Sequence, residues 1–231
     1  RVLFRSAFIG SNGCGKSTLV NLIPRFYDVT DGKITIDGKD IRNVSQHELR
    51  EKLGYVPQKA VLFSGDIASN ILYGNPDGSE AEMTEAATIA QATEFIEQKK
   101  KKYKSTISQG GSNVSGGQKQ RLSIARAIAK HPDIYIFDDS FSALDYKTDA
   151  TLRAKLKEKT SESTVMIVAQ RISTILHADQ IIVLDDGQIV GKGTHKELLK
   201  NCEAYYQIAS SQLSEKELEE DLKEVESYAK R

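Results

Sequence analysis

The chain has 231 residues, of which 39% are hydrophobic and 28% charged, a balance that predicts a folded protein with a sizeable core. Lysine plus arginine and aspartate plus glutamate both number 32, so the formal charge is zero and no general nucleic-acid-binding surface is expected. No apolar run approaches the roughly 18 residues of a membrane span. No secretory leader is visible, and two cysteines, Cys14 and Cys202, give no disulfide framework. A reducing, cytoplasmic compartment is the simplest interpretation.

The first six residues read R-V-L-F-R-S and run directly into an apolar segment. They resemble translated adapter sequence more than native protein. We predict that residues 1–6 are non-native or a junction, and that the chain is the C-terminal part of something longer.

Apolar runs alternate with segments of helical periodicity, which predicts an α/β fold with a mostly parallel sheet. Core strands are expected at residues 7–9, 53–56, 134–137, 165–169 and 181–184. Asp37-Gly38 predicts a hairpin within residues 32–41, and Asp186-Gly187 predicts a second one leading into residues 188–190. Residues 64–130 have helical periodicity and no strand of core quality, so they are expected to form a helical insert.

A phosphate-binding loop follows the first of these strands. Its residues read G-S-N-G-C-G-K-S-T and fit the pattern G-x-x-x-x-G-K-[ST] between a strand and a helix. Backbone N–H groups of such a loop surround phosphate oxygens, its lysine reaches the β- and γ-phosphates, and its serine ligates Mg²⁺. We expect all nine residues to bind nucleotide: Gly10, Ser11, Asn12, Gly13, Cys14, Gly15, Lys16, Ser17 and Thr18.

The apolar strand that ends at Asp138 carries a second carboxylate directly after it, Asp139. In P-loop NTPases the first carboxylate supports the Mg²⁺ ion. Successive side chains of an extended strand point in opposite directions. We therefore expect Asp138 at the metal and Asp139 near an attacking water.

A second anion-binding helix start is predicted by Val114, Ser115, Gly116, Gly117 and Gln118. Ser115 and Gln118 have the spacing of a capping box, and the two glycines leave the backbone bare. One chain then has two phosphate-binding helix ends. The economical arrangement is two ATP molecules between two such domains, each phosphate loop facing the partner's S-G-G-Q.

With these motifs the chain resembles the nucleotide-binding domain of ABC transporters, from about residue 7 to residue 211. Gln58, after Val56-Pro57, matches the Q-loop, and Asp145, in S-A-L-D, matches the D-loop. The resemblance implies a P-loop NTPase (RecA-type) fold that binds ATP with Mg²⁺. It places Ser17, Gln58 and Asp138 at the metal and Asp145 at the nucleotide, and gives Gln58 a part in catalysis beside Asp139 and Gln170.

The resemblance also implies an organisation of the chain and its surroundings. Residues 7–62 and 131–211 would form the ATP-binding core, residues 63–130 a helical subdomain with the signature motif, and residues 212–231 a charged helical tail. Residues 62–67 (L-F-S-G-D-I) resemble the segment that exporters set against their membrane domains. The resemblance also implies transmembrane domains N-terminal on the same polypeptide, with this chain at the cytoplasmic face of the cell membrane.

Two departures from the family pattern concern hydrolysis. Family members that hydrolyse ATP well carry Glu after the strand-end Asp and His in the context V-A-H-R, whereas this chain has Asp139 and Gln170. Asp is one methylene shorter, and a misplacement of about 1 Å can cost on the order of 10²-fold in rate. Gln170 can donate a hydrogen bond to the γ-phosphate but cannot shuttle a proton as His does. We predict a site that retains ATP and hydrolyses it slowly.

The intact S-G-G-Q, shared across a dimer, would complete the active site of a partner. The pattern resembles the degenerate half of a heterodimeric bacterial multidrug-type exporter, and we expect a different half-transporter with Glu and His at the matching positions. An alternative is a regulatory module whose own ATP is never turned over. A third possibility, a DNA-repair or translation ATPase, is disfavoured by the neutral charge and by residues 62–71.

Overall fold

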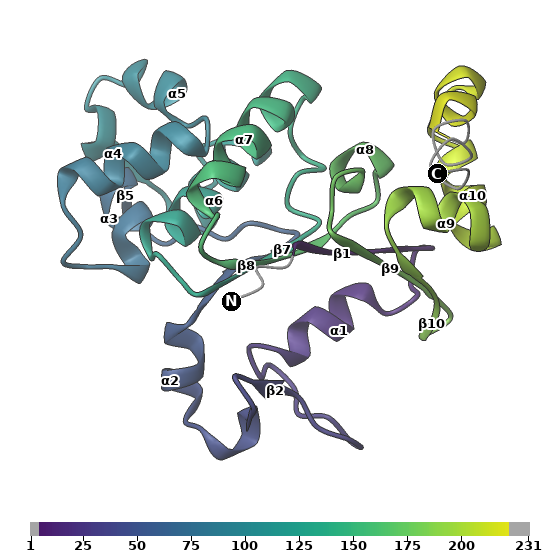
Figure 1. Cartoon of the computed structure of the whole chain (residues 1–231). Helices are drawn as coiled ribbons and strands as arrows, with labels where there is room; N and C mark the ends of the chain where they lie inside the picture. The colour runs from purple at the N-terminus through teal and green to yellow at the C-terminus, as the bar shows by residue number, and fades with distance from the viewer. Residues whose placement is uncertain (1–4, 222–231) are drawn as a thin grey trace. The chain divides into compact units, whose positions relative to one another are not determined.

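The computed structural model describes residues 5–221 of the chain. They form two compact units. The terminal unit contains the residues up to Val44 together with those from Val165 onward, and the central unit is Ser45–Thr164. Figure 1 labels the α-helices and many of the strands of both units. No helix within the described range is long and apolar enough to cross a bilayer.

The sheet of the terminal unit has the strand order β10-β9-β1-β8. Its strands are β1 (Arg5–Gly10), β8 (Thr164–Val168), β9 (Gln180–Asp185) and β10 (Gln188–Gly193). β1 pairs in parallel with both β8 and β9, whereas β10 returns antiparallel to β9. Residues 7–9 of the central strand β1 are fully or almost fully buried, as expected for a parallel strand covered on both faces.

Helices cover this sheet, and those toward the C-terminal end of the chain share one core with the strands. They are α1 (Lys16–Leu22), α8 (Ile172–Ile175), α9 (His195–Asn201) and α10 (Glu203–Ser210). The buried core residues come from the strands, from α8 to α10 and from the helical segment at residues 215–221: Ala7, Ile9, Ala169, Ile172, Ile175, Ile181, Val183, Leu198, Leu199, Cys202, Tyr205, Ala209 and Leu218. Figure 1 shows α9 and α10 as neighbours beside β10.

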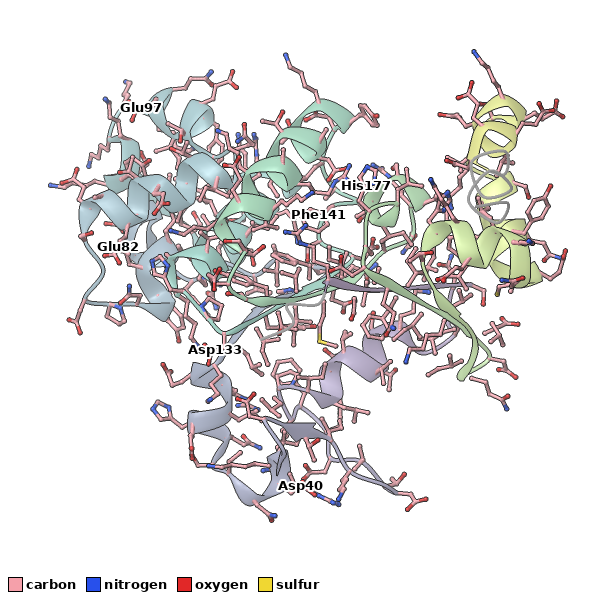
Figure 2. All side chains as sticks on the ribbon, in the orientation of Figure 1. Asp40, Glu82, Glu97, Asp133, Phe141 and His177 are labelled. Atoms are coloured by element: carbon pink, nitrogen blue, oxygen red, sulfur yellow. The ribbon has the colours of Figure 1, made fainter. Side chains whose placement is uncertain are left out.

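Two tight turns have the backbone that their sequences predict. Between β2 (Thr35–Ile36) and β3 (Lys39–Asp40), Asp37 and Gly38 have φ values of 50° and 77°. Between β9 and β10, Asp186 and Gly187 have 43° and 76°. Positive φ at both central residues is the type I′ geometry, which Asp-Gly tolerates best. After β3, η1 (Ile41–Asn43) is capped by Asp40, labelled in Figure 2, whose carboxylate also pairs with Arg42.

The central unit is built on a parallel strand pair, β4 (Leu53–Val56) and β7 (Ile134–Asp138). Its longer helices are α4 (Glu80–Ile89), α6 (Gly116–Ala129) and α7 (Tyr146–Lys159). Shorter elements complete it: α2 (Gln46–Glu51), β5 (Gly65–Asp66), α3 (Ile67–Ile71), η2 (Leu72–Gly74), α5 (Thr93–Glu97), η3 (Lys102–Lys104), β6 (Thr106–Ile107) and η4 (Gln109–Gly111). Phe141, labelled in Figure 2, is buried with its ring 5.2 Å from that of Phe137.

The five predicted core strands and both hairpins are confirmed, and residues 64–130 are mainly helical. Two details differ from the expectation. β1 begins at Arg5 because Arg5 pairs with Val165 of β8, and backbone pairing accepts any residue type. Within the helical segment, β5 and β6 pair as two-residue strands, too short to leave an alternating pattern. The assignment of residues 1–6 as a junction stays a prediction, and residues 1–4 lie outside the described range.

Candidate nucleotide-binding site

The phosphate loop connects β1 to α1 in the terminal unit. A side chain on Gly10 would collide with the carbonyl oxygen of Leu184, so the loop leaves the sheet close to β9. Gly13 and Gly15 have φ values of 82° and 96°, which side-chain-bearing residues rarely adopt. Gly15 is also the N-cap of α1 and offers no side chain to cap its first turn. The start of α1 is thus held in the backbone shape that suits a phosphate group.

Lys16 folds back over this loop and is only 8% exposed. Its ammonium donates to the carbonyl oxygens of Gly10 and Ser11 over 2.9 and 2.7 Å, and it lies 3.4 Å from the sulfur of Cys14. A buried cation needs such acceptors. The loop therefore concentrates positive charge at its centre, where the sequence predicts phosphate oxygens.

The turn between β9 and β10 forms one side of the loop, and sequence reasoning did not connect the two. Ser11 Oγ donates to Asp185 over 3.2 Å, and the Gly187 N–H donates to the Cys14 carbonyl over 3.2 Å. Cys14 is 3% exposed. These contacts span more than 170 residues of sequence, and no local pattern announces them.

In the central unit, the two carboxylates at the end of β7 are almost completely buried. Asp138 and Asp139 are 3% and 7% exposed. β7 ends at Asp138, and Asp139 has a left-handed φ of 46°. The expectation that the two side chains alternate as in an extended strand is therefore wrong. The chain turns at Asp139, where Ser142 Oγ donates to its carbonyl over 3.0 Å.

Each carboxylate has a partner on or after β4. The Gln58 amide donates to Asp139 Oδ2 over 2.9 Å. The Tyr55 hydroxyl donates to Asp138 Oδ2 over 3.4 Å. Burial, and then the charge of Asp138, raise the pKa of Tyr55 well above its usual range, so the phenol keeps its proton. Tyr55 was not among the predicted site residues, because a tyrosine in an apolar strand looks like a core residue.

The predicted capping box at the start of α6 is confirmed. The Gln118 N–H donates to Ser115 Oγ over 3.3 Å, and the Ser115 N–H donates to Gln118 Oε1 over 3.2 Å. Val114, just before the cap, is buried, and a Cβ on Gly116 would meet nothing within 4 Å. The start of α6 therefore has an open backbone surface at Gly116, next to the buried side chain of Val114.

Asp145 has a structural task that the resemblance did not specify. It is the N-cap of α7, and its carboxylate accepts a hydrogen bond from the Thr148 N–H over 3.0 Å. Hydrogen bonds from the Thr148 side chain and backbone hold the pKa of Asp145 below its usual range. The residue stays ionised and fixes the segment after Asp139.

Gln170 lies in the terminal unit, exposed, between β8 and α8. The Ala169 N–H donates to the Phe8 carbonyl over 3.0 Å, which ties the preceding residue to β1. The Gln170 carbonyl accepts a hydrogen bond from the side chain of Gln212 over 2.8 Å. Gln212 was assigned to the tail, and nothing in its sequence context pointed to this contact.

The structure thus gathers the predicted residues in two sets, one on each unit. The terminal unit carries the phosphate loop and Gln170. The central unit carries Gln58, Asp138 and Asp139, the signature segment and Asp145. Ser17, Gln58 and Asp138 supply a hydroxyl, an amide and a carboxylate, the oxygen donors that Mg²⁺ prefers. No group of three or more His, Cys, Asp or Glu side chains in the described part of the chain can hold a metal by itself.

Comparisons with known proteins identify the family of this architecture. The family model described as "ABC transporter" matches residues 5–142. The "Uncharacterized ABC transporter ATP-binding protein" of Mycobacterium tuberculosis is 49% identical over 210 residues, which are 90% of this chain and 36% of that protein. The "Putative multidrug export ATP-binding/permease protein" of Staphylococcus aureus is 46% identical over 206 residues, 89% of this chain and 36% of that protein. The chain thus spans about a third of the length of these relatives.

A solved structure gives the same result. A bacterial Atm1-family ABC exporter with ATP bound superimposes with a TM-score of 0.89 at 40% sequence identity. The match covers 92% of this chain and 37% of the exporter chain.

Proposed function

Because this chain belongs to the ABC transporter family, as a nucleotide-binding domain, we propose that it binds Mg-ATP and helps to power export across a membrane. The observation that carries the proposal is the phosphate loop with the buried Lys16 ammonium at its centre. In this proposal the loop holds the phosphates, Ser17, Gln58 and Asp138 hold Mg²⁺, and Gln170 contacts the γ-phosphate. Bound Mg²⁺ would neutralise charge on the phosphates.

The site is proposed to hold ATP and to hydrolyse it slowly. Asp139 is the candidate base for the attacking water, and its carboxylate is one methylene shorter than that of Glu. The Gln58 amide already uses one oxygen of this carboxylate. An oxygen that already accepts this hydrogen bond is less available to take a proton from water. Both features support slow water activation beside an intact phosphate loop.

The signature segment is proposed to act on a partner's nucleotide. Ser115 and Gln118 fix the start of α6, and the bare backbone at Gly116 is available to an anion from outside the chain. The proposed partner is a second ABC half-transporter with Glu and His where this chain has Asp139 and Gln170. Such a heterodimer would have one fast site, completed by this signature, and one slow site.

The contact with membrane domains is proposed for the exposed aromatic surface around Phe63. Val61, Phe63 and Tyr73 are 56%, 42% and 60% exposed, and the two rings stack at 4.3 Å. Arg126 lies against both rings and binds the carbonyls of Val61 and Asn70. Exposed apolar clusters of this kind mark interaction sites. The membrane domains are proposed to precede this chain on the same polypeptide. The chain itself is proposed to lie at the cytoplasmic face of the membrane.

A purely regulatory module is the second candidate, favoured by the same hydrogen bond from Gln58 to Asp139. In that case this chain's ATP would stabilise the closed dimer without being hydrolysed. The two candidates share every binding residue and differ only in turnover.

The test is steady-state ATPase activity of the full-length assembly with its partner. Lys16→Ala in this chain is compared with the equivalent Lys→Ala in the partner, and Lys33→Ala, an exposed lysine, is the control. If only the partner's substitution abolishes turnover, this chain holds the slow site. If Lys16→Ala lowers turnover as much as the partner's substitution, trapping of labelled nucleotide distinguishes two causes. Either this site hydrolyses ATP, or this site must be occupied by nucleotide for the partner's site to turn over. Normal nucleotide binding after Lys16→Ala would contradict the proposed site.

A further inference from the structure

The backbone around Gln170 is held on both sides by one side chain. The Gln212 amide nitrogen donates to the Gln170 carbonyl over 2.8 Å, and the Gln212 amide oxygen accepts from the Ile172 N–H over 2.8 Å. The two contacts bracket Arg171 and bridge 42 and 40 residues of sequence. A carboxamide carries its donor and its acceptor on separate atoms, so it can bind a carbonyl and an N–H at the same time.

The segment that Gln212 holds needs such a partner. α8 has four residues, and its N-cap, Arg171, makes no side-chain capping hydrogen bond. Ile172 is fully buried, so an unpaired N–H there would be costly. The Gln212 oxygen accepts from this first N–H of α8, which like the other N–H groups of a first turn has no partner within the helix.

Gln212 is itself held firmly by the end of α10. The N–H groups of Gln212 and Leu213 both donate to the carbonyl of Ala209, which is fully buried. Leu213 packs against the terminal core, and Leu218 is 7% exposed within it. The carboxamide therefore projects from a packed segment rather than from a loose tail.

We propose that Gln212 is a positioning residue for Gln170: it fixes the backbone on both sides of Arg171 and thereby sets how far the Gln170 side chain reaches toward nucleotide. The proposal deepens the proposed function and rests on it, because it assumes that Gln170 contacts the γ-phosphate. Since ADP lacks that phosphate, loss of positioning should weaken ATP binding and leave ADP binding unchanged. General damage to the fold would weaken both.

Three variants of the full-length assembly test this, with the partner's phosphate-loop lysine replaced by alanine so that only this site binds. Gln212→Met keeps the size of the side chain and removes both hydrogen bonds. Gln212→Glu keeps the acceptor for the Ile172 N–H and turns the donor into a repulsive oxygen. Gln207→Met is the matched control, because the side chain of the exposed Gln207 donates to Glu203 within α10 and is not bonded to the Gln170 segment. The readouts are equilibrium binding of Mg-ATP and Mg-ADP and hydrogen exchange of the Ile172 amide.

Loss of a hydrogen bond in Gln212→Met should speed Ile172 exchange on the order of fivefold. ATP affinity should fall by about the same factor, with ADP affinity within twofold of wild type. Gln212→Glu should lose ATP affinity while Ile172 exchange stays close to wild type. Equal losses for ATP and ADP, or ATP binding at the level of the Gln207→Met control, would overturn the proposal. Gln170→Ala is measured in parallel: if it leaves the ATP-to-ADP ratio unchanged, the γ-phosphate contact is wrong, while the exchange data still decide whether Gln212 holds the loop.

Discussion

The side-chain amide of Gln58 lies 2.9 Å from Asp139 Oδ2 and donates a hydrogen bond to it. The two residues are 81 positions apart, and both belong to the central unit. Asp139 has a left-handed backbone. The Gln58 amide holds its carboxylate in place and occupies one of the two carboxylate oxygens. The same contact that orders Asp139 thus engages an oxygen that a general base would use.

Lengthening this carboxylate should raise turnover. Asp139→Glu is expected to increase ATP hydrolysis at this site up to on the order of 10²-fold, because the extra methylene covers a misplacement of about 1 Å. The measurement is ATPase activity of the assembly with the partner's site disabled. Asp139→Asn, which is isosteric and cannot accept a proton, is the control and should lower activity. An Asp139→Glu rate no higher than wild type would contradict the slow-site proposal.

The signature segment should serve the partner's site more than its own. Ser115→Ala removes the N-cap of α6 and should cost about 1 kcal/mol of stability. It should also slow turnover at the partner's site while ATP binding by this chain stays unchanged. Ser79→Ala is a matched control, because Ser79 and Glu82 (labelled in Figure 2) form the same capping box on α4. If both variants affect turnover equally, the effect is one of stability alone.

Arg126 should be needed for the aromatic surface around Phe63. Burial lowers the pKa of Arg126 to about 10, and its guanidinium binds Asn70 and Val61. Arg126→Ala should lower the free energy of unfolding by about 2 kcal/mol, since hydrogen bonds from a charged group are lost. Arg126→Lys keeps the charge without the planar fork and should recover part of the loss. Urea denaturation of both variants measures the difference, and equal stability of Arg126→Ala and wild type would contradict this role.

Alkaline pH should unfold the protein through its buried tyrosines. Burial, with a contribution from Glu85, raises the pKa of Tyr135 to about 12. The pKa values of Tyr55 and Tyr205 are also raised, mainly by burial. A group whose pKa is raised on folding stabilises the fold below its unfolded pKa of about 10, and this stability is lost as the pH rises toward the folded value.

Stability should therefore decline from about pH 10 upward. Tyrosinate absorbance should show one set of tyrosines titrating normally and a second set titrating only as the fold opens. Tyr135→Phe should flatten the alkaline loss of stability, whereas Tyr27→Phe, at an exposed position, should not. A single titration of all nine tyrosines near pH 10 would contradict this expectation.

The sequence by itself determined the conformation of short local segments. The phosphate loop, the Ser115–Gln118 box and the two Asp-Gly turns each lie within a few residues, so residue type and spacing specify their backbone. The strands were predicted because buried parallel strands need continuous apolar runs. The family was inferred from the same motifs. Each motif is a rare residue pattern that occurs next to the strand or helix it requires.

Contacts between distant segments were decided only by the tertiary structure. Tyr55 meets Asp138 across 83 residues, and Gln212 meets Gln170 across 42. No periodicity links such positions, because each pair depends on which strands and helices become neighbours. The expected alternation at Asp139 was wrong for a local reason: alternation holds only while the backbone stays extended, and Asp139 has a left-handed φ of 46°. Sequence therefore specified the groups proposed to bind phosphate, and tertiary packing specified how those groups are oriented.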